Sequence, residues 1–186
     1  MTASPLNSRG LFWAVLLLAL IGFARGTQAG AIVVDEWEDL IPANLYDFVP
    51  EGGITSELWL DEGFQKKLKE SERRTRPELE QAKTVLPGYM VPLDYTGDLV
   101  FQFLLVPSAG QCIHVPPPPP NQTVLVTSKQ GVKIRTYADP LIVRGLMRVE
   151  AGQTDYAETG YTLEASEVLD FDFDLIEKLV NELTQE

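Results

Sequence analysis

The chain has 186 residues, a formal net charge of −12, a sequence pI of about 4.5, one cysteine and one histidine. This excess of acid argues against nucleic acid and anionic membrane surfaces as partners, because both require a basic footprint on the protein. A single cysteine excludes an intramolecular disulfide, so the stability of the fold must come from packing.

The first 29 residues have the pattern of a secretory signal peptide. Arg9 precedes an apolar run over residues 11–23, and residues 27–29 supply small side chains at the positions that matter for cleavage. The run is shorter than the roughly 20 residues that a membrane-spanning helix needs. We therefore predict cleavage after residue 29 and a periplasmic or secreted protein, with an uncleaved anchor as the alternative. Removing this segment takes away two arginines and no acid, which changes the net charge from −12 to −14.

Residues 30–84 are predicted to form an N-terminal arm followed by a charged helix or linker. In residues 30–60, Pro42, Pro50 and a glycine pair prevent a long regular element, so we expect short helical pieces whose aromatic side chains cover one side of the core. Residues 61–82 are rich in helix formers, and Pro77 suits the start of a new helical turn. Acids are mixed with the lysines and arginines there, which indicates a solvent-facing surface rather than a binding patch.

Residues 85–170 are predicted to form a β-barrel domain. Turn signals at 95–98, 130–131, 138–140 and 152–160 separate the apolar runs. Short strands with little helix between them favour a mainly β fold, and we expect a small OB-like five-stranded barrel. Gly145 lies within one run and predicts a bulge or sharp bend. The expected strands are 85–93, 99–106, 123–127, 132–136, 141–150 and 161–168.

Residues 171–186 are predicted to form a C-terminal amphipathic helix. Asp172 or Asp174 can cap its N-terminus. Its apolar side chains follow one stripe, which we expect to dock on the barrel rather than on a partner. The stripe consists of Leu175, Ile176, Leu179, Val180 and Leu183.

Residues 110–122 are the most informative segment. They contain the only cysteine, Cys112, and the only histidine, His114, directly before five prolines. Positions i and i+2 of an extended backbone share a face, which predicts that the thiol and the imidazole lie side by side at the start of a stiff polyproline II rod. The candidate metal ligands are Cys112 and His114, and the candidate binding residues are Pro116, Pro117, Pro118, Pro119, Pro120, Asn121 and Gln122.

Several interpretations of this segment remain open. In a structural one, Cys112 is a small buried apolar group, His114 satisfies a backbone carbonyl, and the amides after the prolines fix the return of the chain. In a metal site, the thiolate and imidazole suit zinc or copper, although carboxylates or water would have to complete the set. In a third interpretation Cys112 is a nucleophile that His114 activates, but side chains on one strand stand in parallel, which is poor geometry for proton transfer between them. The rod could also dock in an aromatic groove of a partner.

No common catalytic motif accompanies this segment. The sequence contains no Gly-x-Ser-x-Gly, phosphate-binding loop, His-Glu-x-x-His or Cys-x-x-Cys. We therefore do not expect a classical enzyme, and the cofactor stays open, with zinc as the candidate.

Six motifs resemble an uncharacterised bacterial domain-of-unknown-function family of exported proteins. They are Trp-Glu-Asp-Leu-Ile-Pro at 37–42, Pro-Gly-Tyr-Met-Val-Pro-Leu at 87–93, Phe-Leu-Leu-Val-Pro at 103–107, Cys-Ile-His-Val-(Pro)5-Asn-Gln at 112–122, Val-Arg-Gly-Leu-Met-Arg-Val-Glu at 143–150 and Ala-Glu-Thr-Gly-Tyr at 157–161. The resemblance runs from about residue 36 to residue 170. It implies a secreted or lipid-anchored protein, often encoded beside ABC-type transport systems, some of them linked to zinc limitation. This chain lacks a lipidation cysteine near its leader.

Together, these observations lead to one hypothesis and two rivals. We expect an exported accessory protein of an ABC-type transport system that handles or senses zinc, with a membrane transporter subunit as its partner. The first rival is a metal-free interaction module that uses the polyproline loop, and the second is a thiol-dependent activity.

Overall fold

The structure is a computed structural model that describes residues 32–185. The predicted signal peptide lies outside these residues. No helix within the described range has the length and apolar character needed to cross a membrane.

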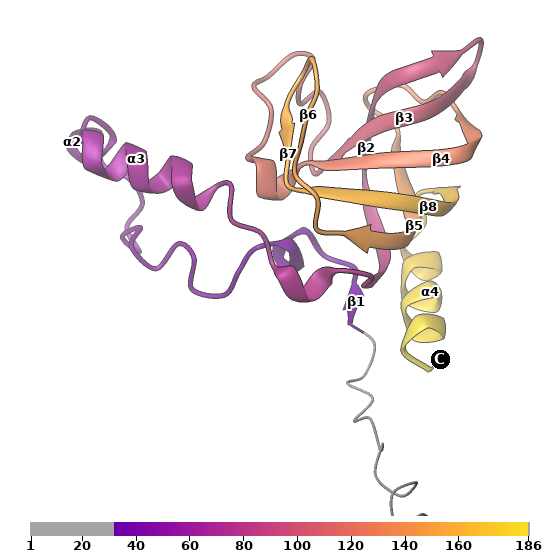
Figure 1. Cartoon of the computed structure of the whole chain (residues 1–186), viewed down its shortest axis with the longest axis horizontal. Helices are drawn as coiled ribbons and strands as arrows, with labels where there is room; N and C mark the ends of the chain where they lie inside the picture. Colours follow the sequence, from indigo (N-terminus) through magenta and orange to yellow (C-terminus); the bar gives the residue numbers. More distant parts are fainter. Residues whose placement is uncertain (1–31, 186) are drawn as a thin grey trace, which may run out of the picture. The chain divides into compact units, whose positions relative to one another are not determined.

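Five strands form a closed barrel in the order β2-β3-β4-β8-β5, and β5 pairs back onto β2 (Figure 1). The β4–β8 pairing is parallel and the other barrel pairings are antiparallel. This order is that of a five-stranded Greek-key barrel and confirms the predicted OB-like fold. The strands are β2 (Lys83–Thr96), β3 (Leu99–Val106), β4 (Val124–Lys133), β5 (Pro140–Arg148) and β8 (Tyr161–Asp170).

Alternate side chains of these strands fill the barrel. Leu86, Met90, Phe103, Leu105 and Tyr161 are all at most 1% exposed and belong to one buried cluster. Burying an aliphatic or aromatic side chain of this size contributes about 1.5–3 kcal/mol, so the interior is the main source of stability. A short strand near the N-terminal end of the described residues, β1 (Val33–Val34), pairs with β2 in parallel.

Two glycines shape the strands. The register between β5 and β8 shifts at Gly145, where a Cβ would collide with the carbonyl oxygen of Glu164, so the predicted bulge is confirmed. The turn signal at residues 130–131 predicted that a strand ends there, but β4 continues through Gly131. Between the pairs Gln102↔Thr127 and Val100↔Val132 lie four residues of β4 but only one of β3, and Gly131 has a φ of 73°. The two predicted strands at 123–127 and 132–136 are therefore mostly one bulged strand.

The C-terminal helix α4 (Phe173–Gln185) covers the outside of β2 and β5 (Figure 1). Asp172 caps it, because its Oδ1 accepts hydrogen bonds from the backbone N–H of Asp174 and Leu175 at 2.9 and 3.1 Å. Leu179 and Leu183 pack with Val85 and Ile142 of the barrel. The predicted docking of the apolar stripe on the barrel is confirmed.

The N-terminal arm contains the predicted short helical pieces: η1 (Trp37–Leu40), α2 (Ser56–Trp59), α3 (Glu62–Ser71) and η2 (Pro77–Leu79). The first of them covers the core. Trp37 donates from Nε1 to the carbonyl of Pro87 at 2.8 Å, and Leu40 is fully buried. Trp59 and Leu60 are instead 53% and 77% exposed, so the expectation that the aromatics of the arm cover the core holds only for its beginning.

Candidate functional site

The candidate site is the connection from β3 to β4, residues 107–123, which begins with a tight turn. The carbonyl of Gly110 accepts hydrogen bonds from the N–H groups of Ile113, His114 and Val115 at 3.3, 2.8 and 3.3 Å. Cys112 has a φ of 64°, in the left-handed region. The backbone is therefore not extended here, and the prediction that the thiol and the imidazole share one face of an extended strand is wrong.

Cys112 packs on the outer face of the barrel. It lies against a cluster formed by Val91, Leu104, Val106 and Ala157, on strands β2 and β3 and on the hairpin of β6 (Gly152–Gln153) and β7 (Glu158–Thr159). The thiol is half-buried, and desolvation raises its pKa above the usual value. Since the thiolate is the reactive and metal-binding form, this environment disfavours both nucleophilic attack and metal ligation by Cys112 at neutral pH.

His114 is exposed and contacts a residue that sequence reasoning missed. Its ring stands edge-on to the ring of Tyr137, in the connection between β4 and β5, with the centroids 4.8 Å apart and an interplanar angle of 77°. No local signal marks Tyr137, because the contact joins two loops that only the fold brings together. Within residues 32–185, no group of three or more His, Cys, Asp or Glu side chains could hold a metal ion.

The proline run divides into an exposed and a covered part. Pro116 and Pro117 are exposed, Pro118 is buried, and Pro119 and Pro120 are half-buried. The run ends in a short 3-10 turn, η3 (Pro120–Gln122). The exposed prolines continue a set of exposed apolar side chains that we call the docking tip. It consists of Ile113, Val115, Pro116, Pro117 and Tyr137, of which Ile113, Val115 and Tyr137 are 47%, 51% and 49% exposed.

Asn121 anchors the base of this segment. It is fully buried, and its backbone N–H donates to the carbonyl of Glu72 at 3.0 Å. Its side-chain Nδ2 lies 3.4 Å from the carbonyl oxygens of Ser71 and Arg74 and from the hydroxyl of Tyr46. One side chain thus joins the arm, the end of α3 and the proline loop.

Two further contacts complete the anchor. Gln122 donates from Nε2 to the carbonyl of Trp37 at 2.7 Å. The N–H of Gly160 donates to the carbonyl of Pro120 at 2.7 Å, directly before β8. Of these two bonds, the one from Gly160 is accepted by a proline carbonyl. Prolines have no N–H to offer, so the donors that hold the run come from the residues around it. Asn121 and Gln122, predicted as binding residues, are placed here as anchors beneath the exposed prolines.

The comparisons with known proteins agree on one family. The family described as "Protein of unknown function (DUF3299)" matches residues 37–170, which is more than half of the chain. A crystal structure of a DUF3299 family protein from Pseudomonas aeruginosa is similar to this chain, with 33% sequence identity and a TM-score of 0.57. That match covers 77% of this chain and 97% of the other. The search of curated proteins finds no match.

Proposed function

This chain belongs to the DUF3299 family, and from that membership and the geometry of residues 107–123 we propose that it is an exported accessory protein of a membrane transport system that docks on a transporter subunit. One observation carries the proposal: four of the five exposed side chains of the docking tip lie on a segment whose base is buried and hydrogen-bonded, and Tyr137 joins them from the β4–β5 connection. Exposed apolar clusters of this kind mark protein-binding surfaces.

The construction of the segment supports docking over catalysis. Prolines have little conformational entropy to lose on binding, and the anchor at Asn121 holds the tip in place before a partner arrives. Aromatic grooves recognise such preformed proline segments. The half-buried Cys112, with its raised pKa, offers no comparable support for a thiol reaction.

Zinc handling is the second candidate, and one observation favours it: the single thiol and the single imidazole lie in the same turn, with His114 exposed. These residues do not fit a closed zinc site, since the described part of the chain groups no three ligands and burial disfavours the Cys112 thiolate. Zinc would therefore require ligands from a partner at the docking tip.

Site-specific photocrosslinking in cells tests the docking proposal. A photoreactive residue at Val115 is expected to give an adduct with a transporter subunit, and the same probe at Lys178, exposed on α4, serves as the control. Replacing Pro116 and Pro117 by alanine should remove the adduct. A Val115 probe that gives no adduct beyond that of Lys178 would contradict docking at the tip, and an adduct with a protein unrelated to transport would contradict the transporter assignment.

A zinc titration of the exported chain, with the reactive thiols counted in parallel, separates the two candidates. Stoichiometric zinc that protects the thiol and is lost in both Cys112→Ser and His114→Ala would support zinc handling. A thiol that stays unreactive until denaturant is added, with no zinc bound, supports the metal-free module.

A further inference from the structure

Strands β4 and β8 separate halfway along their length. They pair in parallel from Val124↔Tyr161 to Thr127↔Glu164, and the pairing stops there although both strands continue. Beyond that point β4 stays paired with β3 on the far side of the β4 bulge, and β8 stays paired with β5 on the far side of the register shift at Gly145. In the part of the chain that the structure describes, residues 128–131 and 165–169 therefore have no partner strand across the opening. We call this opening the β4–β8 seam.

The seam is a continuous hollow rather than a packed joint. One cavity of about 510 Å³ is lined by residues 128–133 of β4, residues 165–169 of β8 and Arg135. A second cavity of about 540 Å³ adjoins it, because both are lined by Lys129, Ala165 and Ser166. The first cavity by itself is lined by both unpaired strand segments, so it is the place where an added strand could lie.

The floor of the seam is apolar. Val132, Ala165 and Val168 are each partly buried and pack against the main core cluster of the barrel. The interior of the barrel is thus incompletely covered at this place. By contrast, the outer faces of β2 and β5 are covered by α4, and the outer face of β3 is covered by the turn that contains Cys112.

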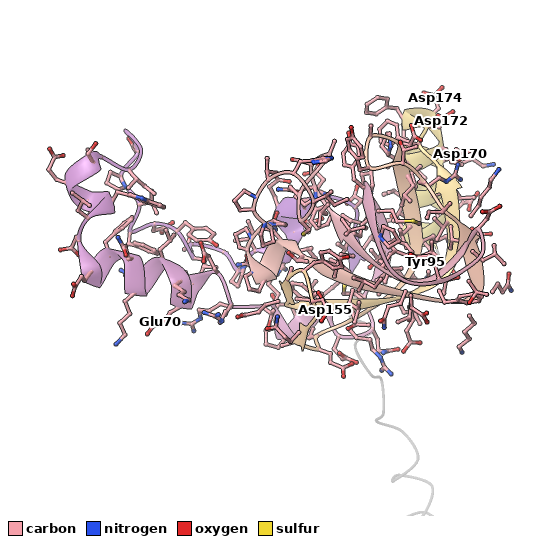
Figure 2. The ribbon with its side chains drawn as sticks, turned by 90° about the horizontal axis from the view of Figure 1, so that it is seen from above. Glu70, Tyr95, Asp155, Asp170, Asp172 and Asp174 are labelled. Atoms are coloured by element: carbon pink, nitrogen blue, oxygen red, sulfur yellow. The ribbon has the colours of Figure 1, made fainter. Side chains whose placement is uncertain are left out.

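The rim of the seam is basic in a strongly acidic protein. Arg135 pairs with Asp170 and Arg144 pairs with Glu167 at 3.6 Å, so these two cations are locally balanced. Figure 2 shows Asp170 beside the beginning of α4. Lys129 and Lys133 are exposed and form no ion pair with any residue from 32 to 185.

We propose that the β4–β8 seam binds an extended peptide segment of a partner protein in which apolar and acidic side chains alternate. The backbone of this peptide would pair with the free strand edges, as in β-strand addition. Its apolar side chains would cover Val132, Ala165 and Val168, and its carboxylates would face Lys129 and Lys133. This site shares no residue with the docking tip, so it stands independently of the function proposed above.

The negative net charge of the protein helps to test whether an acidic peptide binds in the seam. The chain repels acids overall, since its formal net charge is −12, so an acidic peptide must be held by local contacts. A fluorescent probe peptide of about ten residues, alternating valine and glutamate, matches the length of a strand. A second probe replaces each glutamate by lysine.

Binding is measured by fluorescence anisotropy with the chain that remains after the predicted cleavage, residues 30–186, and with two variants of it. Both variants replace two lysines by glutamate and so have the same net charge. We expect the glutamate probe to bind the unaltered chain and to bind the Lys129→Glu/Lys133→Glu variant about tenfold more weakly or worse. The control variant Lys66→Glu/Lys178→Glu carries the same charge change on α3 and α4 and should bind within about twofold of the unaltered chain. Hydrogen exchange should show new protection in residues 128–133 and 165–169 with this probe alone.

Each other result overturns the proposal. An equal loss of affinity in both variants would mean general electrostatic attraction. Protection elsewhere on the barrel would mean a different site, and absence of binding at low salt would mean no peptide site of this chemistry. Protection of the seam that grows with protein concentration and without probe would mean that a second copy of the chain occupies it.

Discussion

The two halves of the β3–β4 connection differ sharply although they are adjacent in the sequence. Residues 113–117 expose apolar side chains to solvent, whereas residues 118–123 include the buried Pro118, Asn121 and Thr123. Thr123 illustrates the second half, since its Oγ1 donates to the carbonyls of Pro118 and Pro119 at 3.3 and 3.0 Å. One continuous motif thus combines an exposed part, which can meet a partner, with a buried part that holds it in place, because a rigid binding segment requires a fixed base.

The largest expected effect tests the anchoring half. Replacing Asn121 by alanine should lower the free energy of unfolding by about 2 kcal/mol, because the buried carbonyl of Ser71 and the part-buried carbonyl of Arg74 lose their donor. Pro117→Ala in the presenting half is the control and should change it by less than about 0.5 kcal/mol. Denaturant titration measures both, and similar effects in the two variants would abolish the distinction between the halves.

The next effect extends the anchoring half to Tyr161, which directly follows Gly160. Its hydroxyl donates to the carbonyl of Leu40 at 2.7 Å and accepts from the N–H of Arg76 at 2.8 Å. Tyr161→Phe removes both bonds and should cost about 1.5 kcal/mol of unfolding free energy. The control is Tyr95→Phe at the exposed end of β2 (Figure 2), which should be close to neutral.

The same tyrosine predicts a pH dependence at the alkaline end. Burial raises the pKa of Tyr161 from 10.0 to about 12. A raised folded-state pKa means that the folded protein holds the proton more tightly than the unfolded chain. Its contribution is complete below pH 10 and is lost as the pH rises towards 12. Unfolding titrations over this range should show a steeper loss for the unaltered chain than for Tyr161→Phe, and parallel curves would contradict the assignment.

A smaller effect on stability is expected at the half-buried Cys112, which directly precedes the exposed residues 113–117. Cys112→Ser should lower the free energy of unfolding by about 1 kcal/mol, because it places a hydroxyl against the apolar cluster around Leu104. Because burial raises the pKa of the thiol, its reaction with a disulfide reagent near neutral pH should be about tenfold slower in the folded chain than in denaturant. Equal rates in both states would show that the thiol is freely exposed.

The smallest effect lies next to the anchor, at the surface pair of Arg73 and Glu158. The two guanidinium hydrogen bonds, at 2.8 and 2.7 Å, lower the pKa of the Glu158 carboxyl. A lowered folded-state pKa adds stability above the unfolded pKa, and this is lost as the pH falls through the folded value. Arg73→Gln should therefore flatten the acid limb of the stability curve slightly, and Lys66→Gln, at an exposed i,i+4 pair, should leave it unchanged. Equal changes in the two variants would contradict a specific role of the Arg73 pair.

Much of the fold could be predicted because its determinants are local. Alternation of apolar residues and turn chemistry place β2, β3, β5 and β8 close to their observed positions. The cap at Asp172 and the stripe through Leu179 and Leu183 predict α4 and the face that it buries. Gly145 predicts a bulge because no other residue fits against the neighbouring strand.

The remaining features could not be predicted from local sequence, because each depends on contacts between residues far apart in the chain. Gly131 carries the same turn signal whether its strand ends or bulges, and the pairing of β4 with β3 selects the bulge. The directions of Cys112 and His114 follow from the turn around Gly110 and from contacts with the barrel face and with Tyr137. The β4–β8 seam exists because two bulges, on different strands, pull neighbouring strands apart. Local sequence sets which segments become strands, but the gaps between them arise from the register of every strand at once.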